Sequence, residues 1–154
     1  MIAGLVATKG FDVLLVVHIV LAVAAFTVLL VLRAAARDVS RGGELAPASR
    51  RTFAGRREVA GRVVHLVPLS GAGLLVLSRG AYSLLTPFVL VGIACWAVAA
   101  TGLETAAFPA QREVAASLRD GSDAGPAAER MRRAVELAAV AVAVAALVMV
   151  AAPT

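Results

Sequence analysis

Four apolar runs constrain the fold of this chain more than any other feature of its sequence. They cover about residues 13–32, 61–78, 84–103 and 135–152. Each is close to the roughly 20 residues that a helix needs to cross a ~30 Å hydrocarbon core. Within lipid the backbone polar groups have to be satisfied internally, which favours helices. The runs therefore predict an all-α fold, a four-helix transmembrane bundle in up-down-up-down order.

Composition agrees with a membrane protein. Hydrophobic residues make up 60% of the 154 residues and the mean hydropathy is +0.88, whereas a soluble domain has an apolar share of roughly 45–50%. The runs leave little room for a soluble module, so we expect a single membrane domain over residues 1–154. The one cysteine, Cys95, lies inside the third run, which excludes an internal disulfide.

Positive charge is concentrated in two of the connecting segments. Of the 15 Lys and Arg residues, eight lie in residues 33–62 and five between the last two runs, which leaves Lys9 and Arg79 elsewhere. Because Arg-rich loops stay in the cytoplasm, we expect cytoplasmic loops at 33–60 and 104–134 and both termini outside. Charge placed between apolar runs in this way argues against nucleic acid as a partner.

The first Arg-rich loop also predicts a lipid partner. Over residues 33–62 its eight Arg outnumber Asp38, Glu44 and Glu58, a net +5. Each basic residue near an anionic leaflet contributes about 1 kcal/mol, so we expect attraction to anionic lipid headgroups. Fourteen Arg against one Lys is typical of a GC-rich bacterial genome and indicates the bacterial cytoplasmic (inner) membrane.

The first run has a competing interpretation as a signal peptide, with small residues following at 34–36. The run is longer than an h-region of about 7–15 residues, and the heavier positive charge comes after it. Both features favour a transmembrane helix.

Small residues at helical spacing predict how the runs pack, because association in lipid depends on close backbone approach. The second run is interrupted by Pro68, Gly71 and Gly73 and is expected to form a kinked helix inside the bundle. The fourth run could instead pack against a second copy or another membrane protein. The predicted faces are His18, Ala22 and Ala25 in the first run, Gly61, His65, Pro68 and Ala72 in the second, and Ala134, Ala138, Ala141 and Ala145 in the fourth.

His18 and His65 are the candidate cofactor ligands, because imidazole is a common axial ligand and four-helix bundles hold haem. His18 lies about four residues outward of the centre of its run and His65 about four inward, an axial offset of ~12 Å. This offset argues against one haem shared by both and favours two hydrogen-bonded packing residues. No Cys, Asp or Met cluster joins them, so no metal site is expected.

Glu104 lies near the cytoplasmic end of the third run, at a depth similar to Arg57, Arg62 and Arg133. We expect an interfacial ion pair there, with a proton relay as the alternative. The other intramembrane or boundary polar residues are Ser70, Thr27 and Glu136, the last expected to anchor the fourth run with Arg132 and Arg133.

The sequence contains no P-loop, nucleophile elbow, HExxH or paired-cysteine motif. It therefore predicts a non-enzymatic accessory or structural membrane protein. The alternatives are a haem- or metal-linked membrane redox protein using His18 or His65, and a small proton-coupled transporter using Glu104.

Short motifs over nearly the whole chain carry a family resemblance. They are Val17-His18-Ile19, the turn Gly80–Leu84 after a Gly-rich run, Phe108-Pro109, and Ala146–Val150 followed by Pro153. With these the chain resembles the DUF2269 type of bacterial four-helix membrane proteins, which is loosely similar to copper-resistance D-type and small haem-pathway membrane proteins. The resemblance implies four spans and no established activity. This chain lacks the further His or Met cluster of those relatives, which argues against copper or haem handling.

Overall fold

The computed structural model describes residues 2–42, 44–54 and 62–151, and these contain helices and turns but no strand. The prediction of an all-α chain is thereby confirmed. The elements are α1 (Ile2–Arg41), α2 (Pro47–Ala54), the 3-10 turn η1 (Arg62–His65), α4 (Leu66–Leu77), α5 (Pro87–Gly102), the π-helical segment η2 (Leu103–Ala107), α6 (Phe108–Asp120) and α7 (Gly125–Ala151).

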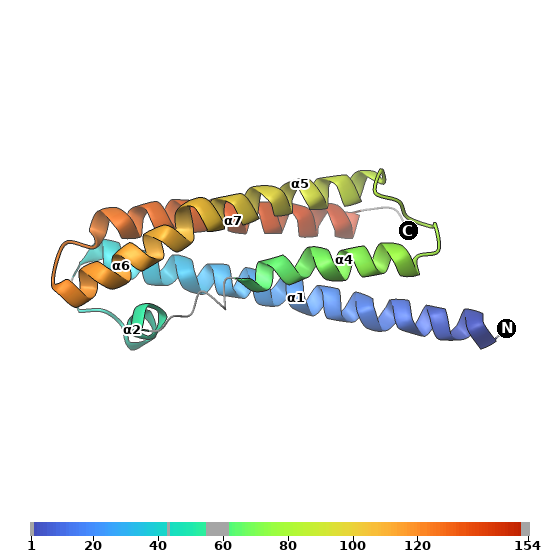
Figure 1. The fold of residues 1–154 in the computed structure, drawn as a ribbon, viewed down its shortest axis with the longest axis horizontal. Coiled ribbons are helices and arrows are strands. Elements are labelled where there is room, and N and C mark those ends of the chain that lie inside the picture. The colour runs from blue at the N-terminus through green and yellow to red at the C-terminus, as the bar shows by residue number, and fades with distance from the viewer. Residues whose placement is uncertain (1, 43, 55–61, 152–154) are drawn as a thin grey trace.

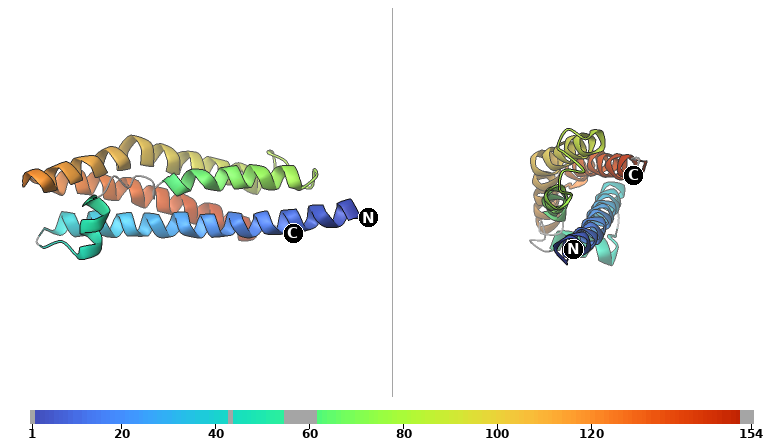
Figure 2. Two further views of the ribbon diagram at one scale, coloured as in Figure 1. Left: turned by 60° about the horizontal axis from the view of Figure 1, so that its bottom comes forward. Right: turned by 90° about the vertical axis from the view of Figure 1, so that its right-hand side faces the viewer.

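The helices lie side by side along one long axis (Figure 1). α7 packs against both α1 and α5, and α4 packs against α1, as the further views also show (Figure 2). One end, the hairpin end, holds the start of α1, the end of α7 and the connection between α4 and α5. The other, the arginine end, holds residues 33–41 of α1 with α2, α6 and the start of α7. Both Arg-rich stretches therefore lie at the same end.

Three helical stretches of the described chain are long and apolar enough to cross a membrane. They are Lys9–Arg41, Pro87–Asp120 and Gly125–Ala151, while Arg62–Leu77 is a shorter apolar helix. These helices identify a multi-pass membrane protein by length and composition.

The predicted packing faces of the first and fourth runs are buried in part, because Ala22, Ala134 and Ala145 are only half-buried. In α1 the residues His18, Ala25 and Leu32 are buried at intervals that place them on one face. In α7, Ala138 and Ala141 are buried as predicted. Small residues are thus buried on both α1 and α7, which pack against each other, and small residues allow the close approach that association in lipid requires.

The face predicted for the second run is wrong. Gly61 lies outside the described residues, Ala72 is exposed, and the buried positions are Val64 and Ser70. A Cβ placed on Gly73 would lie 2.8 Å from Leu14 Cδ2. Close approach to α1 at this glycine turns α4 so that a different face is buried.

Pro68 was expected to kink this helix, but it lies in the first turn of α4. The first N–H groups of a helix have no intrahelical acceptor, so the missing N–H of proline costs little there. The irregularity precedes the proline, as the 3-10 turn η1.

The predicted loop at 104–134 is also wrong as secondary structure, because α6 and the start of α7 fill it. The third helix continues from α5 through η2 and past Pro109 into α6. At the end of η2 the Phe108 N–H donates to the Leu103 carbonyl. The wider π-turn relieves the clash that a proline ring makes with the preceding turn. Only residues 121–124 lie between the helices, and Gly121, which follows the last residue of α6, has a φ of 69°.

Among the described residues, several of the largest buried side chains lie towards the arginine end. Phe108, Val114, Met131 and Val135 are fully buried, and Phe53 of α2 is 6% exposed. α2 packs against α1 and α6. Towards the hairpin end, many large apolar side chains of α1 face outward instead. Water drives apolar burial and lipid does not, so this distribution fits a bundle that has one end in water and the rest in lipid.

Candidate functional site

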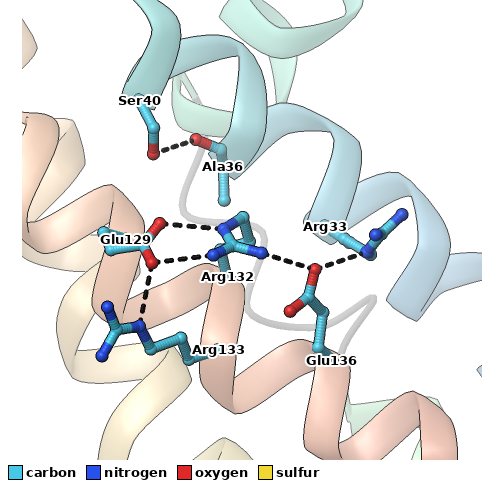
Figure 3. Close-up of polar contacts among 7 residues, drawn as sticks. All are labelled: Arg33, Ala36, Ser40, Glu129, Arg132, Arg133 and Glu136. Carbon is cyan, nitrogen blue, oxygen red and sulfur yellow. Dashed lines mark hydrogen bonds and ion pairs between the residues drawn. The ribbon is translucent and has the colours of Figure 1, made fainter.

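A cluster of five charged residues joins α1 to α7 at the arginine end (Figure 3). Arg33 Nε donates to Glu136 Oε1 at 2.8 Å, and Arg132 donates to the same oxygen at 2.7 Å. Arg132 also holds both carboxylate oxygens of Glu129, at 2.7 and 2.8 Å, and Arg133 donates to Glu129 at 2.8 Å. We call these five residues the arginine cluster.

The predicted anchor of the fourth run is therefore confirmed for Arg132 and wrong for Arg133, which bonds to Glu129 instead. The contact with Arg33 was not predicted, because it joins residues 103 positions apart. Hydrogen bonds from Arg132 and Arg133 lower the pKa of Glu129 to about 2, and this residue precedes the apolar run of α7. With three guanidinium groups and two carboxylates, the cluster keeps one net positive charge.

Two further arginines at this end face outward. Arg37 and Arg51 are exposed, and neither makes a hydrogen bond or an ion pair with another residue of the described ranges. Arg50, by contrast, donates to Glu44 at 2.7 Å. Arg37 and Arg51 are thus placed where they can meet anions outside the protein.

Glu104 meets His65, with Oε1 3.1 Å from Nε2. The two side chains are 48% and 31% exposed, and they come from the irregular segments η2 and η1. The Trp96 ring stands edge-on to the His65 ring, with centroids 6.3 Å apart. Of the arginines considered as partners of Glu104, Arg133 is bonded to Glu129 and Arg57 lies outside the described residues.

His18 meets Ser70 on the buried side of α4, with His18 Nδ1 2.8 Å from Ser70 Oγ. The Ser70 hydroxyl donates its one proton to the Val67 carbonyl at 2.8 Å. If that proton stays in the bond to Val67, the hydroxyl oxygen accepts from Nδ1–H of His18, and a neutral imidazole then has an unprotonated Nε2. Thr27, the other polar residue of the first run, only donates to the Val23 carbonyl of its own helix.

A cavity of about 340 Å³ opens beside His18. Its walls come from α1, α4 and α5, with Met149 of α7. Because α4 packs on α1 and α5 packs on α7, the cavity lies between the two helix pairs, near the hairpin end. Apart from His18, its lining is almost entirely apolar and contains no charged residue.

The two candidate haem ligands are engaged in separate contacts, His18 with Ser70 and His65 with Glu104. The described part of the chain contains no group of three or more His, Cys, Asp or Glu side chains arranged to hold a metal ion. The structure therefore offers two separate histidine contacts and no paired-histidine site.

Three polar groupings thus stand out in an apolar bundle: the arginine cluster, the His65–Glu104 pair, and the His18–Ser70 pair beside the cavity. Sequence reasoning singled out both histidines, Glu104 and Ser70 without assigning these pairs. In comparisons with family models, curated proteins and solved structures, this chain has no match.

Proposed function

We propose that this protein is a non-enzymatic accessory or structural protein of the bacterial cytoplasmic membrane, crossing it four times with both termini outside. One observation carries the proposal: Arg-rich segments far apart in the sequence meet at one end, away from the connection that holds Arg79. Positively charged segments are retained in the cytoplasm. The arginine end is accordingly the cytoplasmic end.

The shorter helix Arg62–Leu77 is proposed as the fourth span. Its residues reach ~24 Å at ~1.5 Å per residue, less than the ~30 Å of a typical hydrocarbon core. A short span is accommodated by local thinning of the bilayer and by flanking side chains that reach to the interface. Arg62 and Arg79 stand at its two ends, as this arrangement requires.

We propose that the arginine end holds the protein against the anionic inner leaflet. Arg37 and Arg51 are exposed there, and each basic residue near such a surface contributes about 1 kcal/mol. The cluster of Arg33 with Glu136 fixes α1 to α7 beside them. A structural role follows from this arrangement, with a second copy or another membrane protein as a further partner along the lipid-facing side of α7.

The topology is tested with single cysteines in a Cys95→Ser background. Ser83→Cys, in the α4–α5 connection, should react with a membrane-impermeant maleimide added outside the cell. Ser122→Cys, in the α6–α7 turn, should react only after the membrane is permeabilised. A reporter fused after Thr154 should be external. A cytoplasmic reporter, or equal labelling of both cysteines from outside, would overturn the proposal.

The lipid contact is tested by the amount of phosphatidylglycerol retained by the purified protein in mixed neutral and anionic nanodiscs. The double variant Arg37→Gln/Arg51→Gln should retain several-fold less phosphatidylglycerol than the unmodified chain. Lys9→Gln/Arg79→Gln is the matched control, because it removes two charges at the opposite end. Equal losses in the two double variants would show that the arginine end has no special role.

A second candidate function is a haem-linked redox protein, favoured by one observation. His18 borders a cavity and bonds to Ser70 through Nδ1, which leaves Nε2 as the nitrogen that could serve as a single axial ligand. A haem held there would supply one-electron redox chemistry. A Soret band in protein purified from its native membrane, lost in His18→Ala and kept in His65→Ala, would favour this function over the structural one.

A further inference from the structure

Trp96 carries a buried hydrogen-bond donor that the protein itself leaves without an acceptor. Its indole Nε1 is buried, and no described residue accepts from it. The same side chain lines the apolar cavity between the two helix pairs. We propose that this cavity binds an uncharged, apolar carbonyl compound from the membrane core, of the ketone or quinone class, whose oxygen accepts from Nε1–H of Trp96. The inference goes beyond the accessory role proposed above, because it gives the bundle a small-molecule ligand.

The unpartnered donor decides which polar group the ligand carries. An indole nitrogen only donates, so its partner has to be an acceptor. A buried N–H without an acceptor is unfavourable, and the hydrocarbon core holds no water that could supply one. Of the other polar side chains in the lining, His18 is bonded to Ser70 and Tyr82 is 37% exposed. An acceptor is therefore most stabilising at Trp96.

The wall beside Trp96 can make room for the ligand oxygen. Gly92 lies one turn before Trp96, on the same face of α5. A Cβ on Gly92 would stand 2.8 Å from Cε of Met149, so the glycine leaves space for this methionine against α5. Nε1 is covered in the unliganded structure, and an oxygen reaches it only when a neighbouring side chain moves. Met149 borders the cavity and methionine is flexible, so it is the side chain that we expect to move.

The size and charge of the cavity select an uncharged molecule with an apolar body. At about 340 Å³ the cavity is about twice the ~150 Å³ of an engineered apolar cavity that holds benzene, which leaves space for a substituted ring. Its lining contains no charged residue. A carboxylate or an ammonium group would enter without a counter-charge, which is costly, whereas a carbonyl brings an acceptor without a charge.

The depth of Trp96 distinguishes a free carbonyl compound from a phospholipid. With the topology proposed above, α5 starts at the outer boundary of the hydrocarbon core with Pro87. Trp96 then lies ~14 Å below this boundary at ~1.5 Å per residue, close to the middle of a ~30 Å core. The ester carbonyls of phospholipids lie at the boundary, where they cannot reach Trp96. The carbonyl therefore belongs to a molecule that dissolves in the core itself.

The His65 ring is the competing partner for the indole N–H. The two rings are 6.3 Å apart between centroids, with an angle of 85° between their planes. A contact from N–H to an aromatic face is weaker than a hydrogen bond to oxygen, so a carbonyl that enters the cavity should be preferred. If the His65 ring satisfied the donor, a carbonyl would give the ligand no advantage.

The hydrogen bond can be observed directly, because the chain contains one tryptophan and its indole N–H gives a single ¹H–¹⁵N cross-peak. The protein in lipid nanodiscs is titrated with 4-pentylacetophenone and, as a matched compound without the carbonyl, 1-ethyl-4-pentylbenzene. The ketone should move the cross-peak saturably to lower proton field. In partition between nanodiscs with and without the protein, the ketone should bind at least about fivefold more tightly than the hydrocarbon, the ratio that one hydrogen bond gives.

Variants assign this preference to Trp96 and the binding to the cavity. Trp96→Phe keeps an aromatic ring and removes the N–H, so it should bind both compounds with equal affinity. Gly92→Leu fills the cavity and should weaken the binding of both. Gly10→Leu is its matched control, since a Cβ at Gly10 has nothing within 4 Å. If Gly92→Leu fails to fold, Ala72→Leu fills the same cavity from α4.

An unshifted indole cross-peak together with equal binding of the two compounds would overturn the proposal and assign the donor to the His65 ring. A preference for the ketone that survives in Trp96→Phe would overturn it as well, and so would the absence of saturable binding of either compound. None of these outcomes affects the topology, which the maleimide labelling tests separately.

Discussion

Arg33 of α1 donates a hydrogen bond to Glu136 of α7 across 2.8 Å, where the apolar run of α1 ends and that of α7 begins. The two side chains are 42% and 31% exposed. Their contact therefore fixes the relative height of the two helices that form the main contact of the bundle.

The Arg33–Glu136 pair should have a measurable but modest coupling energy. In a double-mutant cycle with Arg33→Gln and Glu136→Gln, we expect about 0.5–1 kcal/mol, because partly exposed ion pairs contribute in this range. The measurement is the free energy of unfolding in detergent micelles. A coupling near zero would mean that Arg132 alone satisfies Glu136.

Acid should weaken the arginine cluster. The pKa of Glu129 is about 2 in the folded protein against an ordinary value near 4.5. Its contribution to stability is therefore fully present above about pH 4.5 and is lost as the pH falls towards 2. We expect the melting temperature to fall over this window, and the fall to be smaller in Glu129→Gln. Glu44→Gln, which removes an exposed carboxylate paired with Arg50, is the control that should keep the full fall.

Gly73 should tolerate alanine and reject a large side chain. A Cβ there meets Leu14 Cδ2, the end of a flexible side chain, so Gly73→Ala needs only a rotamer change. Gly73→Leu has to separate α4 from α1, and overpacking of this kind costs about 1–3 kcal/mol. Gly10→Leu is the matched control, since a Cβ at Gly10 has nothing within 4 Å. Equal melting temperatures for the two leucine variants would contradict the close approach of α4 to α1.

Glu104→Gln should leave the fold intact, because its amide can still bond to His65 and both side chains are partly exposed. We expect a change in stability below about 1 kcal/mol. For a structural protein, vesicles containing the unmodified chain should show no proton flux above empty vesicles in a pH-sensitive dye assay. A flux that disappears in a folded Glu104→Gln variant would support the proton-coupled transporter instead.

The helical character of the chain and part of the buried face of α1 could be predicted from sequence, because His18 and Ala25 lie on one face of a helix and are buried. The pairs His65–Glu104 and Arg33–Glu136 could not, since each joins distant segments whose relative height depends on packing. Ser70 was recognised as a polar position, but its contact with His18 can be seen only from the distance between the two side chains in the fold.

The helices at 104–134 were missed although a signal was present. Polar composition and Pro109 indicated a loop, but Phe108, Val114, Ala128 and Met131 are all buried. In α6 and in α7 the buried positions recur every three or four residues, as in an amphipathic helix. The helical periodicity of the apolar residues, rather than the average polarity of the segment, predicts that the helices continue beyond the membrane.

Because α1 is one continuous helix, a small change in its tilt produces a large displacement of its ends. Its 40 residues extend ~60 Å at ~1.5 Å per residue, so a tilt of about 5° displaces one tip by ~5 Å relative to the other. Packing against neighbouring helices sets the tilt of a membrane helix, and the Arg33–Glu136 contact joins α7 to α1. A substitution that changes the packing along the apolar part of α1 would therefore displace its basic end together with the start of α7.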